Sequence, residues 1–227
     1  CDTVTVTFSN NINIGAGANI VKVYTALSGD ASKLNDTAQN TFCIAYSGNY
    51  TIDPNTAASA TNFQTFAAAV SALACGGVSG PVVFTVAAGT YNEQVDISSI
   101  YGASATNNIT FDGGIGNGAT RIITYNSTST NFTVRLNGAN FFKFRNLTIT
   151  ALNSSLGTAL FYGANATSDS FYNVTFNGVS TTSATTNHAV IYSPGTTNIS
   201  HNMSFDSCRI NNGYYGSFIQ SSSTNSL

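Results

Sequence analysis

The sequence predicts an all-β protein in which a right-handed parallel β-helix, a solenoid with an N-terminal capping helix, follows a short partial β-sandwich. Three observations support this fold class. Polar and apolar residues alternate with a period of two over short segments, which is typical of half-buried strands. Groups of polar, apolar, polar and apolar residues recur in the second half of the chain, as in solenoids. The 15 Phe and 11 Tyr supply a buried core.

The composition separates this chain from several classes of protein. Only 7% of the residues are charged, compared with about a quarter in a typical globular domain. Thr, Ser and Asn together make up about two fifths of the chain. The net charge is −2 and the basic residues form no dense run, so we expect no nucleic-acid partner. No long apolar run is present, which predicts no membrane span. The aromatic content argues against a disordered chain.

The four cysteines are Cys1, Cys43, Cys75 and Cys208. None stands in a Cys-x-x-Cys pair or near a histidine at metal-ligand spacing, so we expect no metal and no cofactor. We favour a disulfide between Cys1 and Cys43, because both lie in the N-terminal module. Buried free thiols are the alternative.

Residues 1–48 form the first module. Residues 3–8 alternate strictly between polar and apolar types, and a turn-rich segment precedes another short strand near 41–45. The Gly-Asp and Asn-Asp-Thr turn residues before this closing strand resemble those of cell-adhesion-related Ig-like domains of bacterial surface proteins. The resemblance implies the end of an Ig-like β-sandwich.

Residues 49–227 form the second module. Apolar residues recur at helical spacing over about 61–75, with Thr61 or Asn62 as a cap and two glycines at the end, which predicts a helix. The apolar run at 81–86 predicts a strand buried on both faces. Because an open solenoid end must be covered, we assign the helix to that end.

A recurring asparagine marks equivalent turns of the predicted solenoid. Asn108, Asn146 and Asn173 each precede an apolar, a polar and an apolar residue, and Ser207 stands at a fourth such position. Asparagine tolerates left-handed backbone geometry and can bond to the asparagine of the next coil. The pattern therefore predicts a structural ladder of these four residues, with Asn146 and Asn173 stacked.

The segment from Phe63 to Phe111 carries a family resemblance. Its sequences NFQTFAAAVSAL, GVSGPVVFTVAAGTYNEQVDI and IYGASATNNITFDG resemble the cap and first coils of pectin-lyase-like β-helices in large secreted proteins of Bacteroidetes-type bacteria. The resemblance covers about residues 49–227. It implies type IX secretion and display on the cell surface or release, without by itself implying lyase activity.

The candidate chemistry is sparse. Enzymes that cut uronic-acid polymers need clustered aspartates, whereas Asp112, Asp169 and Asp206 stand alone in the sequence, and only the fold can bring them together. The two histidines lie in polar segments, which predicts surface positions. A cationic patch for an acidic glycan is the remaining candidate site, and it comprises Arg135, Lys143 and Arg145.

These observations favour a non-catalytic, extracellular segment of a surface adhesin, stalk or fibre that contacts glycans or another cell-surface partner. The alternative is a polysaccharide-acting enzyme, either pectate-lyase-like or a glycoside hydrolase. Asp-Thr-apolar motifs place candidate O-glycosylation at Thr3 and Thr37, and Asn-x-Ser/Thr sequons add candidate N-glycosylation. We also expect a longer native polypeptide, or self-assembly, to cover the open end of the solenoid.

Overall fold

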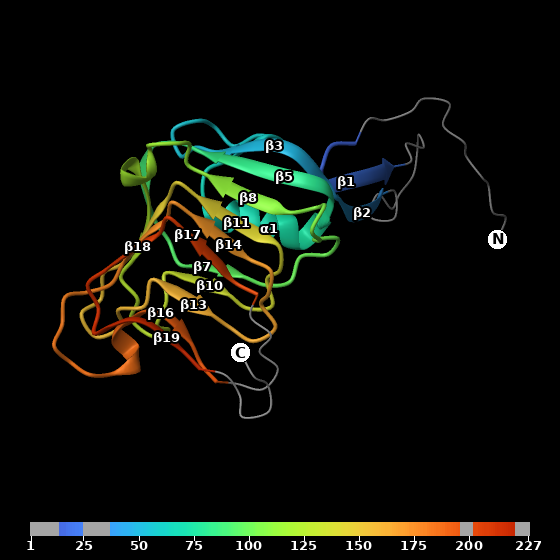
Figure 1. Cartoon of the computed structure of the whole chain (residues 1–227). Helices are drawn as coiled ribbons and strands as arrows, with labels where there is room; N and C mark the ends of the chain where they lie inside the picture. The colour runs from blue at the N-terminus through green and yellow to red at the C-terminus, as the bar shows by residue number, and fades with distance from the viewer. Residues whose placement is uncertain (1–13, 25–36, 196–201, 221–227) are drawn as a thin grey trace.

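The computed structural model describes residues 14–24, 37–195 and 202–220, and it confirms the predicted parallel β-helix (Figure 1). From β5 onward the chain adds one strand in turn to each of three sheets, so that every strand pairs in parallel with the strand one coil away. The first sheet consists of β7 (Val95–Ile97), β10 (Val134–Leu136), β13 (Leu160–Tyr162), β16 (Ala189–Ser193) and β19 (Tyr215–Ile219).

The other two sheets complete the solenoid. The second sheet consists of β4 (Asn62–Phe63), β3 (Tyr46–Ile52), β5 (Val78–Val86), β8 (Ile109–Asp112), β11 (Phe142–Arg145), β14 (Ser170–Tyr172) and β17 (Ser204–Asp206). The third sheet consists of β6 (Gly89–Asn92), β9 (Arg121–Tyr125), β12 (Thr148–Ala151), β15 (Thr175–Asn177) and β18 (Arg209–Asn211). Short 3-10 helices occupy Gly118–Thr120 and Thr186–His188.

The core is a stack of aromatic rings on the inner face of the second sheet. Phe84, Phe111, Phe144, Phe171 and Phe205 occupy one register position on five successive strands. Their ring centroids lie 4.9–5.5 Å apart from one coil to the next. This separation is close to the strand spacing of about 4.8 Å, so each coil adds one ring to the stack. Each coil therefore depends on its neighbours for its buried contacts.

Helix α1 (Phe66–Gly76) packs at the N-terminal end of the solenoid (Figure 1). It begins later than predicted, because the N-cap is Thr65, whose hydroxyl accepts a bond from the Ala68 amide. Asn62 instead donates to loop carbonyls such as that of Thr56. The Glu93 carboxylate accepts the two amides that open the helix, those of Phe66 and Ala67, at 2.9 and 2.8 Å. No helix in the described part of the chain is long and apolar enough to cross a membrane.

A disulfide joins the N-terminal hairpin to this helix. Strands β1 (Gly17–Tyr24) and β2 (Thr37–Ile44) pair antiparallel, and Cys43 of β2 bonds to Cys75 of α1. The predicted Cys1–Cys43 bridge is therefore wrong. The helix packs against both hairpin strands, which brings Cys75 within 5.7 Å of Cys43 between Cα atoms. Cys1 lies outside the described residues.

Breaking this bridge should loosen the hairpin. We expect Cys75→Ser to lower the free energy of unfolding by about 2–4 kcal/mol. The bridge joins two residues that are 32 positions apart in sequence, so it lowers the conformational entropy of the unfolded chain. Urea melts without reductant measure the effect. Cys208→Ser is the matched control, since Cys208 is a free thiol. An equal loss in both variants would contradict the assignment.

Candidate functional site

The outer face of the first sheet carries a row of polar and aromatic side chains. On β7, β10 and β13 a central residue stands between two buried apolar residues, so its side chain points away from the core. Strand register aligns the outward residues coil by coil into a set that we call the outer row. The outer row consists of Asp96, Arg135, Phe161, Tyr192 and Phe218.

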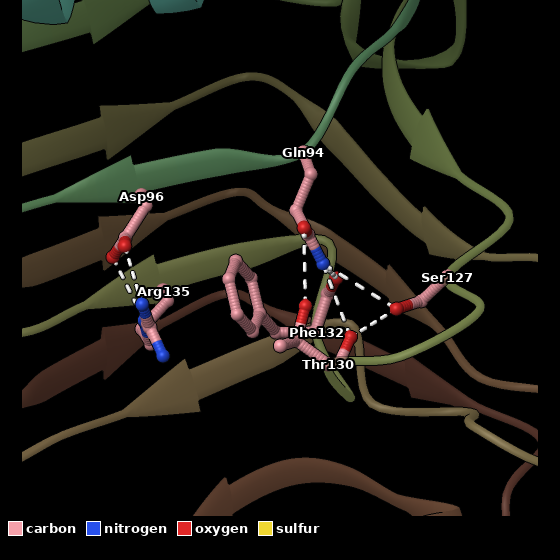
Figure 2. Close-up of polar contacts among 6 residues, drawn as sticks. All are labelled: Gln94, Asp96, Ser127, Thr130, Phe132 and Arg135. Atoms are coloured by element: carbon pink, nitrogen blue, oxygen red, sulfur yellow. Dashed lines mark hydrogen bonds and ion pairs between the residues drawn. The ribbon is translucent and has the colours of Figure 1, made fainter.

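An ion pair forms one end of the outer row. Arg135 donates from Nε to Asp96 Oδ1 at 2.8 Å and from its terminal nitrogen to Asp96 Oδ2, in the two-point geometry that guanidinium and carboxylate groups favour (Figure 2). The guanidinium carbon lies 4.5 Å from the centroid of the Phe132 ring. The hydrogen bond to Asp96 raises the pKa of Arg135, so this side chain remains a cation and cannot act as a base. Both side chains remain partly exposed.

Gln94 fixes the loop beside this ion pair. Its Nε2 donates to the Phe132 carbonyl at 2.8 Å and to the Thr130 carbonyl at 3.1 Å, while its Oε1 accepts from the Thr130 hydroxyl (Figure 2). Ser127 donates to the same Thr130 carbonyl. The amide is thus fully engaged in holding the loop that carries Phe132.

Aromatic rings continue the outer row beyond the ion pair. Phe161 lies 6.4 Å from Phe132 and 5.5 Å from Tyr192, and Tyr192 lies 6.1 Å from Phe218, all between ring centroids. Phe161, Tyr192 and Phe218 are each partly exposed. Partly exposed aromatic rings can pack against the C–H face of a pyranose ring. The outer row therefore combines a charged, hydrogen-bonding end with an apolar track.

The predicted cationic patch is not assembled. Arg135 lies on β10 of the first sheet, whereas Lys143 and Arg145 lie on β11 of the second sheet. The turn between these strands directs them to different faces of the solenoid, so the prediction is wrong. Arg135 is committed to Asp96 instead.

The three aspartates considered in the sequence do not converge. Asp112 accepts bonds from the Gly114 amide and from Asn146 Nδ2, both at 2.8 Å. Asp169 is buried, and Asp206 lies on β17, three strands beyond β8. Asp96, which sequence reasoning passed over, is the carboxylate that shares the outer row with a cation and aromatic rings.

The structure brings part of the asparagine ladder together. Asn146, Asn173 and Ser207 adopt left-handed backbone angles, with φ of 53°, 52° and 55°, and Asn173 Nδ2 donates to Asn146 Oδ1 at 2.8 Å. Ser207 donates instead to its neighbour Asp206. Asn108 is not part of this ladder, because it precedes β8 of the second sheet, whereas Asn146 precedes β12 of the third sheet.

Removing this contact should weaken the coils. We expect Asn173→Leu to lower the free energy of unfolding by about 1–3 kcal/mol, since it loses the bond to Asn146 and places a branched side chain at positive φ. Asn173→Gly, which tolerates that φ, should lose less. Thermal melts compare the three proteins, and two unchanged melts would contradict the ladder's contribution.

The remaining predicted positions are structural or lie outside the described residues. Thr37 is exposed on β2, and Thr3 lies outside the described residues. The surface prediction for His188 is wrong: the residue is 6% exposed, and Nε2 lies 3.0 Å from the Ser154 carbonyl oxygen. His201 lies outside the described residues.

Comparison with solved structures supports the fold. One match is a crystal structure of a mutant pectin methylesterase in complex with a hexasaccharide; it is 17% identical, has a TM-score of 0.51 and covers 72% of this chain. Another is a pectin methylesterase with hexasaccharide VII, at 17% identity and a TM-score of 0.49, covering 66% of this chain and 46% of that one. The chain spans 49% of the first enzyme's length. No family model and no curated protein matches the sequence.

This comparison corrects the leading functional prediction. The sequence favoured a non-catalytic adhesin segment, but the similar solved structure with the TM-score of 0.51 is an enzyme, a pectin methylesterase. The finding contradicts that prediction and the expectation that the chain is not an enzyme. At this identity the likeness shows the right-handed parallel β-helix alone, so the chemistry rests on the residues of the outer row.

Proposed function

We propose that this chain acts on a polysaccharide laid along the outer face of the first sheet. The observation that carries the proposal is the register of the outer row, which aligns Asp96, Arg135, Phe161, Tyr192 and Phe218 on five consecutive coils. A row across parallel strands repeats about every 4.8 Å, so it presents several successive contacts to an extended chain of sugar rings. The aromatic members take ring faces, and the ion pair takes polar substituents.

The charge of the outer row favours an uncharged or esterified saccharide. Arg135 is the cation of the row, and its charge is already balanced by Asp96 through two hydrogen bonds. A carboxylated sugar would have to displace Asp96 or lie beside it, at an electrostatic cost. Methyl-esterified galacturonan is therefore the probe that we expect to bind better than its unesterified form.

Asp96 is the reacting group that we assign to this site. Its oxygens accept from Arg135 and retain lone pairs that can take a proton from a water as that water attacks the ester carbonyl. The bond from the carbonyl carbon to the methoxy oxygen then breaks, and the proton passes from Asp96 to the leaving methoxide, which departs as methanol and leaves a free carboxylate on the sugar. The Arg135 N–H groups can stabilise the negative charge that develops. Glycoside hydrolysis normally uses two facing carboxylates, and among the described outer-row residues Asp96 is the carboxylate. Ester hydrolysis therefore fits the site better than cleavage of the glycan backbone.

A substrate panel tests this function. The purified protein is incubated with methyl-esterified galacturonan, unesterified galacturonan and a neutral xylan, and methanol, reducing ends and unsaturated products are measured. We expect methanol release from the first substrate and its loss in Asp96→Asn. Arg145→Gln, an exposed substitution on the second sheet, is the matched control. No methanol from the esterified galacturonan, or equal methanol release by the parent and Asp96→Asn, would contradict the proposal.

Extracellular location is part of the same proposal. The Cys43–Cys75 disulfide supports it, because such bridges persist in oxidising compartments. The predicted module boundary at residue 48 falls inside β3, which begins at Tyr46 and pairs with β5 of the solenoid. We further propose secretion by the type IX route, an Ig-like identity for the part of module 1–48 that precedes β3, glycosylation at Thr3 and Thr37, and self-assembly. Mass spectrometry of the protein from its source tests the glycans at both threonines.

A further inference from the structure

A groove on the outer face of the third sheet is separate from the outer row. It has a volume of about 510 Å³, and Gly116, Gly118 and Ala119 contribute to its lining. Two rows of side chains, two residues apart along the strands, line the sheet side. The first row is Thr148, Thr175 and Arg209, and the second row is Thr150, Asn177 and Asn211, each aligned by strand register.

The second row is held in place by its own hydrogen bonds. Asn211 Nδ2 donates to Asn177 Oδ1 at 2.9 Å, and Asn177 Nδ2 donates to Thr150 Oγ1 at 3.1 Å. Each amide nitrogen carries two hydrogens, so the ladder leaves further donors that can face a ligand. The groove thus presents fixed polar groups at successive coils, which lowers the ordering cost of binding a hydroxyl-rich molecule.

The first row supplies fixed geometry and a cation. Thr148 donates to the Gly118 carbonyl at 2.9 Å, which ties the 116–119 segment to the sheet. Arg209 is exposed, and the one ion pair found within the described residues joins Arg135 and Asp96, not Arg209. The nearby Asp206 accepts a bond from Ser207. Arg209 can therefore bind the carboxylate of a ligand, whereas Arg135 is already paired with Asp96.

We propose that this third-sheet groove is a second saccharide site that takes an acidic sugar of the uronate class. The sugar carboxylate binds the Arg209 guanidinium, and its ring hydroxyls bond to the amides of Asn177 and Asn211. The two sites divide the ligands by charge, since the outer row takes esterified or neutral rings and the groove takes free uronates. The groove does not depend on the proposed function of the outer row.

Calorimetry with a galacturonate trisaccharide tests the groove. The background is the full chain carrying Tyr192→Ala, which weakens the outer row and leaves the third sheet intact. We expect binding that weakens with added salt and falls at least tenfold in Arg209→Gln, a loss of about 1.4 kcal/mol by the usual conversion. Asn177→Ala should weaken binding as well, whereas Arg145→Gln should leave it unchanged.

The outcomes separate the two sites. The fully methyl-esterified trisaccharide should not lose affinity in Arg209→Gln, because it carries no carboxylate. Equal binding of the free acid to the Arg209→Gln and parent proteins, or no binding of the free acid by a folded parent, would overturn the groove proposal. Neither result bears on the outer row, whose proposed function the methanol-release assay tests independently.

Discussion

Raising the pH from about 4 to above 7 should destabilise this protein. Asp169 is 1% exposed, and its two oxygens accept from the Phe142 amide and the Tyr162 hydroxyl, both at 2.8 Å. Burial raises the pKa of Asp169 to about 7 from its ordinary value of 3.8, although both hydrogen bonds act in the opposite direction. Between these values the folded protein holds a proton that the unfolded chain has released.

The buried proton on Asp169 sets the direction of this change. The stabilisation is fully present below the unfolded pKa and is lost as the pH rises through the folded pKa, so stability falls over this range. A pKa difference of one between the folded and unfolded states corresponds to about 1.4 kcal/mol, which gives a fall of roughly 4 kcal/mol between about pH 4 and 8. Urea unfolding at the two pH values measures the difference.

A neutral side chain should remove this dependence. Asn at position 169 can accept from the Phe142 amide and donate to the Tyr162 oxygen, so Asp169→Asn should be as stable as the parent at about pH 4 and more stable at about pH 8. Asp206→Asn, at an exposed position, is the control and should keep the parental slope. A parental slope in Asp169→Asn would show that Asp169 is not the titrating group.

Truncating the centre of the aromatic stack should have a similarly large effect. Phe144 is fully buried, with its ring 5.5 Å from Phe111 and 5.2 Å from Phe171. We expect Phe144→Ala to lower the free energy of unfolding by about 3–5 kcal/mol, because two coils lose contacts to the same ring. Chemical denaturation measures this loss.

An outward aromatic residue provides the matched control. Tyr172 lies on the next strand of the second sheet but is 46% exposed. Tyr172→Ala should cost well under half of the Phe144→Ala effect, because it leaves no cavity in the core. Similar losses in the two variants would mean that the stack does not dominate the stability of the coils.

The β-helix could be predicted from the sequence because every coil repeats the same short pattern of apolar and turn residues. Each coil needs apolar residues at alternate positions and a turn residue that tolerates positive φ, and both signals are visible without knowing long-range contacts. The same locality explains the error at Asn108. Each coil contains two similar strand entries on different sheets, and a four-residue match cannot tell β8 from β12.

The site was harder to predict because it is built by register across coils. The members of the outer row lie on separate strands, and only pairing in space aligns Asp96 with Arg135 and Arg135 with Phe161. Proximity in sequence instead suggested a patch of Arg135 with Lys143, which a single turn separates. The available signal was the repeated apolar-x-apolar triplet on β7, β10 and β13.

A bound polysaccharide should lie along the outer row, and a crystal structure of the complex measures its position directly. We predict that a crystal structure of the protein with a methyl-esterified galacturonan hexasaccharide will show sugar rings over Phe161 and Tyr192, with polar substituents at the Asp96–Arg135 pair. The double variant Phe161→Ala and Tyr192→Ala should lose this binding while remaining folded. Sugar density elsewhere on the solenoid with the outer row empty, or undiminished binding by the double variant, would show that the outer row is not the polysaccharide site.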